Sequence, residues 1–143
     1  MPSDQPKWVY KVKRDELGPI IKHRARLVAR DFVQREGIYF EVFAPVARME
    51  SVHLLLALAA AKDWRVHHLD VKLAFLNGEL VEMVFVRQPP GFAIKGEEHK
   101  VLRLRKALYG LRQAPRAWNA KLDTTLGELG FQQCATEHAL YTR

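Results

Sequence analysis

Residues 66–78, with the sequence VHHLDVKLAFLNG, constrain the fold of this chain more than any other segment. Their first half is rich in apolar residues and predicts a buried strand that ends at Asp70, with Phe75 in the turn that follows. A carboxylate at the end of a buried strand is costly unless it binds something positive, and a divalent metal ion is the natural candidate. Such a site usually needs a second and a third carboxylate, so their presence decides whether the chain can be an enzyme.

Asp70 also has a simpler interpretation, since an Asp at the end of a strand, taken alone, is more often a turn or cap residue than a metal ligand. His67 and His68 are adjacent and therefore point to opposite faces of a strand. With Cys134 as the only cysteine and no CxxC or HxxxH spacing, the sequence argues against a zinc site. It also contains no nucleophile elbow, phosphate loop or dinucleotide-binding glycine pattern.

The charge of the chain points to a polyanionic partner. Lys and Arg number 23 against 16 Asp and Glu, which gives a net charge of +7. The alternative is a basic surface that is merely solvated. Two clusters favour the first interpretation, because each lies in a segment with regular apolar residues and so belongs to a structured face. They are Lys22, His23, Arg24, Arg26 and Arg30, and Arg103, Arg105, Lys106, Arg112 and Arg116.

Length and composition suit one domain of 143 residues with a core of its own. The longest apolar run, residues 54–61, is far shorter than the roughly 20 residues that span a bilayer. The first six residues lack the apolar core of a signal peptide. A single cysteine allows no internal disulfide, and we expect an intracellular protein, cytoplasmic or nuclear, with no membrane association.

The periodicity predicts strands and helices without strict alternation. The predicted strands are residues 7–12, 20–30, 66–70, 101–105 and the beginning of one at 140–143. The first two are joined by a turn at residues 15–19 into a basic hairpin, in which Arg24, Arg26 and Val28 share one face. The segment QPPGF at residues 88–92 cannot lie in a central strand and interrupts the chain.

Two helices are predicted. One runs over residues 52–62 with Ser51 as its N-cap, and it is apolar on most sides, as a core helix would be. The other begins at Pro115, ends near Gly130 and carries an apolar face. That face consists of Trp118, Leu122, Leu126 and Leu129. The expected class is α+β, with the helices packed on one face of a largely antiparallel sheet.

Four blocks of sequence follow one another in a specific order. They are ARLVAR at 25–30, FAPVARMESV at 43–52, LDVK with AFLNG between 69 and 78, and QPPGF at 88–92 leading to KALYGLRQAPRAW at 106–118. Together they resemble the reverse transcriptase of copia-type LTR retrotransposons, and the resemblance covers residues 8–141. It implies one partial right-hand polymerase domain over residues 1–143. Residues 7–48 would be a fingers-like hairpin and connection, and residues 49–143 a partial palm with a return to the fingers.

The resemblance also implies roles for individual residues. Asp70 matches the first catalytic carboxylate, and Val71 the position whose backbone carbonyl completes the shell of a Mg²⁺ or Mn²⁺ ion. Phe75 matches the aromatic shelf beneath the deoxyribose, where it would clash with a 2′-hydroxyl. Arg24 and Arg26 fall on the strand that neutralises the incoming triphosphate.

Further roles concern the nucleic acid. Gln113 matches a glutamine near the sugar of the nucleotide and the template. Lys22, Arg30, Arg112 and Arg116 are the candidates for contact with the nucleic acid. The implied partners are therefore an RNA or DNA template–primer and a dNTP.

The chain departs from the family pattern in ways that predict inactivity. In the family a Tyr-x-Asp-Asp hairpin follows the Leu-Tyr segment, whereas this chain stops at Arg143 and contains no Asp-Asp pair. One carboxylate cannot hold two divalent ions about 4 Å apart, so we expect neither stable metal binding nor polymerisation by this chain alone. Leu73 also replaces a residue that is usually polar.

Two further interpretations of the sequence remain. The chain could be a basic nucleic-acid-binding or interaction module without catalysis, or a degenerate remnant of an element with no role. In a partial palm we also expect an exposed apolar sheet edge, through which copies of the chain could associate.

Overall fold

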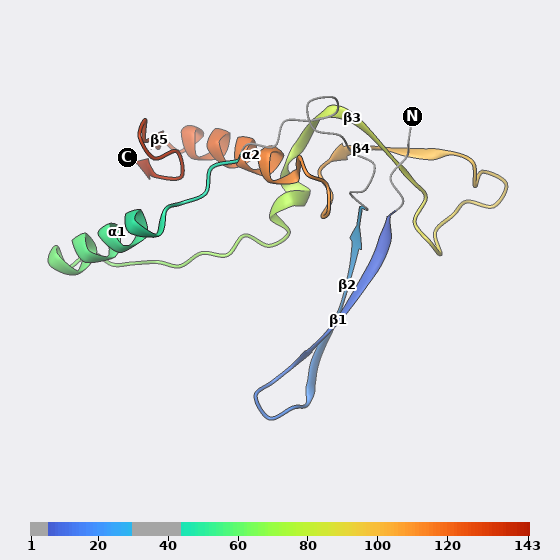
Figure 1. Cartoon of the computed structure of the whole chain (residues 1–143), viewed down its shortest axis with the longest axis horizontal. Helices are drawn as coiled ribbons and strands as arrows, with labels where there is room; N and C mark the ends of the chain where they lie inside the picture. Colours follow the sequence, from blue (N-terminus) through green and yellow to red (C-terminus); the bar gives the residue numbers. More distant parts are fainter. Residues whose placement is uncertain (1–5, 30–43) are drawn as a thin grey trace.

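The computed structural model describes residues 6–29 and 44–143 and has an α+β architecture (Figure 1). In chain order, the elements are β1 (Lys7–Arg14), β2 (Ile20–Val28), α1 (Met49–Ala61), the 3₁₀ helix η2 (Ala74–Asn77), β3 (Glu79–Arg87), β4 (Val101–Lys106), α2 (Ala114–Glu128), β5 (Gln132–Gln133) and β6 (Tyr141–Thr142). The strands form three separate antiparallel pairs, β1–β2, β3–β4 and β5–β6. The α+β class and the antiparallel pairing are thus confirmed, and the described strands form small two-stranded sheets rather than one larger sheet.

The β1–β2 hairpin projects away from the rest of the molecule (Figure 1). Its turn is stabilised by Asp15, whose Oδ1 accepts a 2.8 Å hydrogen bond from the backbone N–H of Leu17. At the base of the hairpin, the indole of Trp8 donates to the backbone oxygen of Pro90 at 3.1 Å, and its ring centroid lies 5.8 Å from that of Phe92. The predicted basic hairpin is confirmed, and its base is fixed to the loop after β3.

Strand β3 was not predicted from the sequence, although its valines are typical of a strand. It pairs with the predicted strand β4, and residues 88–100 connect the two. Gln88 organises this connection, because its side-chain amide donates to the backbone oxygen of Glu97 at 2.6 Å and accepts from the N–H of Ile94 at 2.8 Å. The predicted interruption at residues 88–92 is confirmed.

Helix α2 begins and ends as predicted. Pro115 lies in its first turn, where a missing N–H costs nothing. At its other end, Gly130 has φ +84°, its N–H donates to Gly127 and the N–H of Phe131 donates to Leu126. This pair of bonds is a Schellman motif, which requires a residue in the left-handed region. Trp118, Leu122 and Leu126 are half-buried, whereas Leu129 is exposed.

The buried core is small and lies where β2, β3, β4 and α2 converge. Its members are Ala29, Val84, Ala107, Leu111 and Ala114, with half-buried Phe75, Leu80, Leu104, Leu108 and Ala117 packed against them. Three of the five buried members are alanines, so the backbones of the converging segments approach closely. The core therefore joins the basic hairpin to the segment after Asp70 and to the start of α2.

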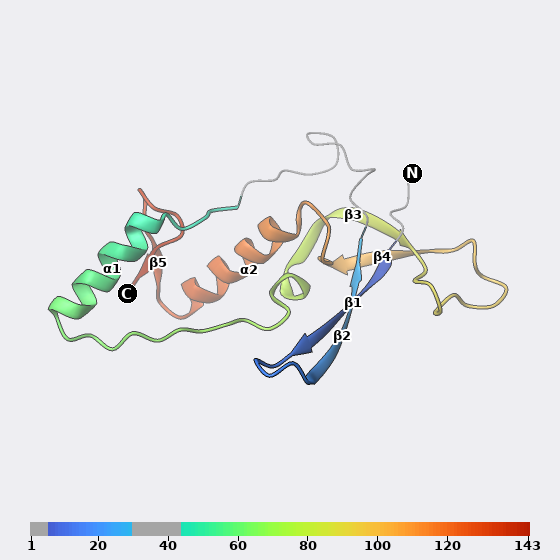
Figure 2. The ribbon, with the colours of Figure 1, turned by 60° about the horizontal axis from the view of Figure 1, so that its bottom comes forward.

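Helix α1 lies apart from this core, and its expected burial is wrong. Its N-cap position is Arg48, without a side-chain cap bond, rather than Ser51, whose hydroxyl donates to Glu137 at 3.1 Å. Only Ala59 of the helix is buried, and Leu54 is 61% exposed. Figures 1 and 2 show α1 at the end of the molecule beside β5. The helix has apolar residues on most sides, but the described residues offer few surfaces to cover them.

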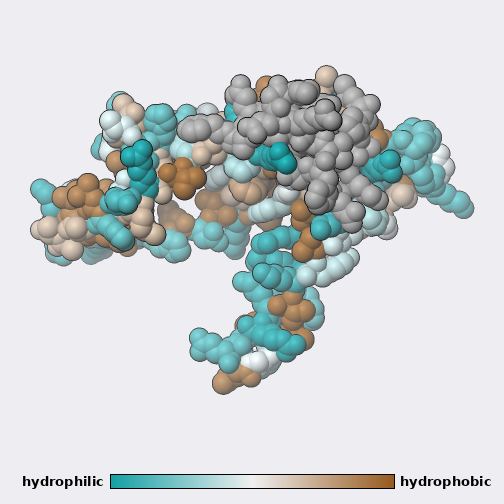
Figure 3. All heavy atoms as spheres, viewed as in Figure 1, coloured by the Kyte–Doolittle hydropathy of each residue, from teal (hydrophilic) through white to brown (hydrophobic). Residues whose placement is uncertain are grey.

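The buried strand expected at residues 66–70 is also wrong. The chain there is extended but belongs to no strand, and Leu69 is 85% exposed. A strand needs a partner for its backbone N–H and C=O groups, and none of the described segments pairs with it. Exposed apolar surface thus lies over α1 (Figure 3) and along residues 64–73, and it also includes Val81 and Met83 of β3. Among the described residues, no helix has both the length and the apolar character that crossing a membrane requires.

Candidate functional site

The candidate site is a cluster of three side chains from three distant segments. The ring of Tyr109 lies between Arg26 of β2 and Phe75 of η2. The Tyr109 and Phe75 ring centroids are 5.2 Å apart at an interplanar angle of 50°, and the guanidinium carbon of Arg26 lies 5.4 Å from the centroid of the Tyr109 ring. We refer to Arg26, Phe75 and Tyr109 as the junction cluster. It unites two of the residues to which the sequence assigned a nucleotide-binding role.

The backbone around Tyr109 explains why these segments meet. The carbonyl of Tyr109 accepts a 2.8 Å hydrogen bond from the N–H of Ala29, which directly follows β2. Gly110 has φ +91°, and a Cβ there would collide with the backbone oxygen of Ala29 and lie 2.7 Å from Cγ1 of Val28. Only glycine permits this conformation together with this close approach. The base of the hairpin is therefore held against residues 107–111.

A second close approach positions Phe75. Gly78 follows η2, and a Cβ there would lie 2.6 Å from the carbonyl carbon of Ala117 and 2.6 Å from the backbone nitrogen of Trp118. Before η2, Leu73 has φ +55°, an unusual conformation for a residue with a branched side chain. The backbone of η2 is thus constrained on both sides of Phe75, and its half-buried ring packs on the core.

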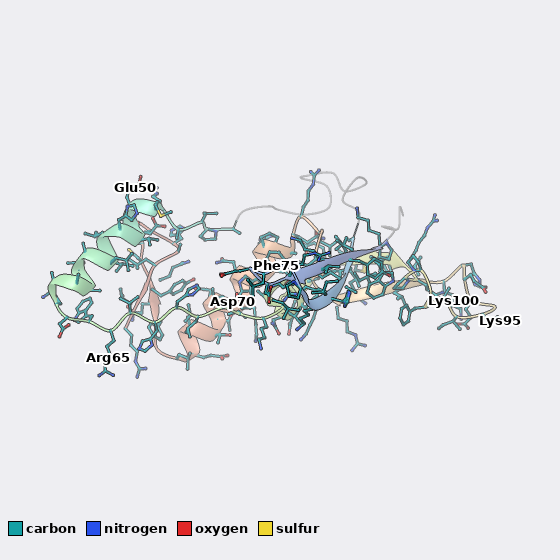
Figure 4. The ribbon with its side chains drawn as sticks, turned by 90° about the horizontal axis from the view of Figure 1, so that it is seen from below. Glu50, Arg65, Asp70, Phe75, Lys95 and Lys100 are labelled. Atoms are coloured by element: carbon teal, nitrogen blue, oxygen red, sulfur yellow. The ribbon has the colours of Figure 1, made fainter. Side chains whose placement is uncertain are left out.

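Asp70 and Val71 lie outside the junction cluster. Both are exposed and belong to the extended segment that runs from α1 to η2 (Figure 4). Within residues 6–29 and 44–143, no group of three or more His, Cys, Asp or Glu side chains could hold a metal ion. One exposed carboxylate and one backbone carbonyl do not form the ligand set that a pair of divalent ions needs. The described residues therefore do not fit a two-metal site.

The β1–β2 register places positive charge on one face of the hairpin. Residues directly opposite each other in an antiparallel pair share a face, and the pairs include Val9 with Arg26, Lys11 with Arg24 and Lys13 with Lys22. We call this the basic face, and its cations are Lys7, Lys11, Lys13, Lys22, Arg24 and Arg26. The ion pairs between described residues include none of them. Two of the cross-strand pairs, Lys11 with Arg24 and Lys13 with Lys22, place like charges directly opposite each other, which is destabilising.

Gln113 occupies a different environment from the one expected. It is 2% exposed, and neither polar atom of its side chain has a hydrogen-bond partner among the described residues. It lines a pocket of about 100 Å³ together with Glu79, Glu82 and Arg116. A buried amide without partners costs about 1–3 kcal/mol. The structure places the Gln113 side chain in the interior. Its role near a nucleotide stays a prediction.

The remaining predicted nucleic-acid contacts are dispersed. Arg112 is exposed just before α2, and Nη1 of Arg116 in α2 lies 3.9 Å from Oε1 of Glu82. Lys22 is on the basic face, and Arg30 lies outside the described residues.

Tyr109 is the site residue that sequence reasoning missed. It belongs to the KALYGLRQAPRAW block, but the pattern of that block gave it no role. An aromatic residue directly before a glycine in a block of that kind is the signal that could have identified it, since the glycine allows a close backbone approach beside the ring. No periodicity relates residues 26, 75 and 109.

Clear pKa shifts among the described residues occur away from the junction cluster. Partial burial, with the neighbouring Asp123 carboxylate, raises the pKa of the Tyr141 hydroxyl. A hydrogen bond with the Thr136 hydroxyl lowers the pKa of the Cys134 thiol, and backbone N–H groups lower the pKa of Glu98. These shifts supply no acid or base next to Phe75 or Arg26.

Comparisons with known proteins show which proteins this chain is similar to. The family model described as reverse transcriptase (RNA-dependent DNA polymerase) matches residues 3–143. The retrovirus-related Pol polyprotein from transposon TNT 1-94 of Nicotiana tabacum is 43% identical over 136 residues, which is 94% of this chain and 10% of the polyprotein. The corresponding polyproteins from transposons RE2 and RE1 of Arabidopsis thaliana are 41% and 40% identical over the same share of this chain.

This chain therefore spans about a tenth of the length of the curated relatives that it matches. No solved structure matches it significantly.

Proposed function

Since this chain belongs to the reverse transcriptase (RNA-dependent DNA polymerase) family, in its copia-type branch, we propose that it forms the fingers and the first part of the palm of the polymerase domain. The junction cluster is the observation that supports this proposal most. It brings a cation of the projecting hairpin to the aromatic residue that follows Asp70. The proposal assigns the first group to the triphosphate of the nucleotide and the second to its sugar.

In this proposal each part of the site acts on a different part of the nucleotide. Arg24 and Arg26 neutralise the triphosphate, for which guanidinium groups are well suited because they donate two hydrogen bonds in a fixed geometry. Phe75 supports the deoxyribose and excludes a 2′-hydroxyl. Gln113 remains a candidate for contact near the sugar and template, and Lys22, Arg30, Arg112 and Arg116 for contact with the nucleic acid.

Polymerases of this family use divalent metal ions, which would stabilise the charge that develops during phosphoryl transfer. Asp70 and the Val71 carbonyl are the residues of this chain that would contribute ligands. The described residues do not complete the set. We therefore propose that the 143 residues alone bind substrates but do not extend a primer.

We expect no template-dependent incorporation when the chain is incubated with a primer–template, dNTPs and either Mg²⁺ or Mn²⁺. The reason is that, among the described residues, no other carboxylates join Asp70 in a group that could hold two ions. Gel analysis of a labelled primer measures the result, and the variant Asp70→Ala is the control for contaminating polymerase. Extension by the native chain that disappears in Asp70→Ala would contradict the proposed inactivity.

A non-catalytic nucleic-acid-binding module is the second candidate function, and the basic face supports it. Six cations on one side of a projecting hairpin form a surface that can follow a phosphate backbone. Contacts to phosphates carry no sequence information, so we expect binding without sequence preference.

We expect the affinity for a single-stranded oligonucleotide to fall steeply with salt, since each neutralised phosphate releases counterions. Replacing Lys13 and Lys22, which face each other on the hairpin, with alanine should lower the slope of log K against log salt by about 1.4, or about 0.7 per phosphate contact. Fluorescence anisotropy at several salt concentrations measures the slope.

The matched control replaces two lysines outside the hairpin, Lys95 and Lys121, and removes the same net charge. It should leave the slope nearly unchanged if binding occurs on the basic face. Equal slopes for both double variants would show that net charge, rather than this face, determines binding.

A further inference from the structure

We propose that Tyr109 is a positioning residue that holds the Arg26 guanidinium and the Phe75 ring in a fixed relation, and so couples triphosphate binding to selection of the sugar. The inference rests on the proposed function of Arg26 and Phe75, to which it adds a third residue. Neither the sequence blocks nor the family comparison assigns Tyr109 such a role.

The two contacts of the Tyr109 ring are of different kinds. A guanidinium 5.4 Å from the ring centroid is attracted by the electron-rich face of the ring. The Phe75 ring lies 5.2 Å away, within the separation of attractive aromatic pairs, at a tilt of 50° between offset-stacked and edge-to-face. One side chain therefore contacts both the group that meets the phosphates and the group that meets the sugar.

The position of Tyr109 is set by its backbone and not by its side chain. Its carbonyl accepts the hydrogen bond from Ala29, and Gly110 beside it permits the close approach of the two segments. A change of the Tyr109 side chain leaves both of these features in place. Loss of the ring can therefore be separated from loss of the link between hairpin and core.

Preorganisation explains why the ring matters for binding. Arg26 is exposed on a two-stranded hairpin, and a free arginine side chain loses rotamer freedom when it binds a phosphate. Contact with Tyr109 restricts the guanidinium before the ligand arrives. The same ring limits the movement of Phe75, whose clash with a 2′-hydroxyl is effective only if the ring stays in place.

The experiment compares Tyr109→Leu with Tyr109→Phe, which keeps the ring and serves as the conservative control. In the ¹⁵N-labelled chain, the Nε–Hε signal of Arg26 should carry a ring-current shift that Tyr109→Phe retains and Tyr109→Leu loses. Titration with dATP and with ATP, which differ only by the 2′-hydroxyl, measures both affinities. We expect Tyr109→Leu to bind dATP about fivefold more weakly and to lose most of its preference over ATP, with Tyr109→Phe close to the native chain.

The outcomes distinguish this inference from the proposed function. An unchanged Arg26 signal in Tyr109→Leu, an unchanged dATP preference, or equal losses in both variants would overturn the positioning role. If dATP binds the native chain no better than it binds Arg24→Ala/Arg26→Ala, the proposed nucleotide site is wrong. The Arg26 signal, which needs no nucleotide, would then still test whether Tyr109 orders the guanidinium. Urea unfolding of each variant confirms that the chain remains folded.

Discussion

Replacing Gly110 with alanine is expected to destabilise the fold by about 2–5 kcal/mol and to separate the basic hairpin from the core. A residue with a Cβ at φ +91° costs about 1–2 kcal/mol, and the overlap with a neighbouring backbone adds about 1–3 kcal/mol. The overlapping atoms are the carbonyl group of Ala29 and Cγ1 of Val28, which cannot move without disturbing the end of β2. Since small domains are stable by only about 5–15 kcal/mol, this is a large fraction of the total.

Urea unfolding followed by circular dichroism measures the change in stability. Gly91→Ala and Gly96→Ala are matched controls, because both glycines have φ +84° but no atom within 4 Å of the place that a Cβ would occupy. They should show only the cost of the backbone conformation, about 1–2 kcal/mol. If Gly110→Ala is no more destabilising than these controls, the close approach between Gly110 and Ala29 does not hold the hairpin.

Local sequence patterns were sufficient for elements that stabilise themselves. The hairpin follows from its alternating residues and from Asp15 and Gly18 in the turn. Helix α2 follows from Pro115 at its start and Gly130 at its end. In each case the residues that determine the element lie within it or next to it, so their pattern can be recognised without knowledge of the tertiary structure.

Elements that depend on distant partners were predicted less well. The pattern of residues 66–70 indicates a strand, but a strand forms only where another segment accepts its hydrogen bonds, and the described residues provide none. Helix α1 has the composition of a buried helix, yet burial depends on what covers it. In both cases the sequence pattern shows that the segment is suited to burial, but it does not show whether another segment buries it.

The candidate site likewise contains residues that the sequence identified and one residue that depends on distant contacts and was missed. The resemblance to a known family identified Arg26 and Phe75, and the structure brings both to one ring. Tyr109 could not be found by periodicity, because contacts between three distant segments leave no repeat in the sequence. Gln113 is the opposite case: a motif gave it a role near the nucleotide, but its side chain lies in the interior with no hydrogen-bond partner among the described residues.

Gly78→Ala is expected to destabilise the fold by about 3 kcal/mol, although the backbone of Gly78 is unstrained. Gly78 has φ −73°, a value that alanine adopts readily, so the cost arises from space alone. Its Cβ would lie within 3 Å of the carbonyl carbon and oxygen of Ala117 and of the backbone nitrogen of Trp118, all part of helix α2. Because helix backbone cannot yield as a side chain can, η2 and α2 would have to separate.

The control for Gly78→Ala is Gly127→Ala, which introduces the same methyl group into α2 itself. Gly127 has no atom within 4 Å of the position of a Cβ, and alanine favours a helix over glycine by up to about 1 kcal/mol. The two substitutions should therefore change the free energy of unfolding in opposite directions, as measured by urea unfolding. Separation of η2 from α2 would also move Phe75 away from Tyr109, so Gly78→Ala should lose the contact between these rings, measured by nuclear Overhauser effects, whereas Gly127→Ala retains it. A destabilised Gly78→Ala chain that keeps this contact would mean that the core, rather than the η2–α2 contact, positions Phe75.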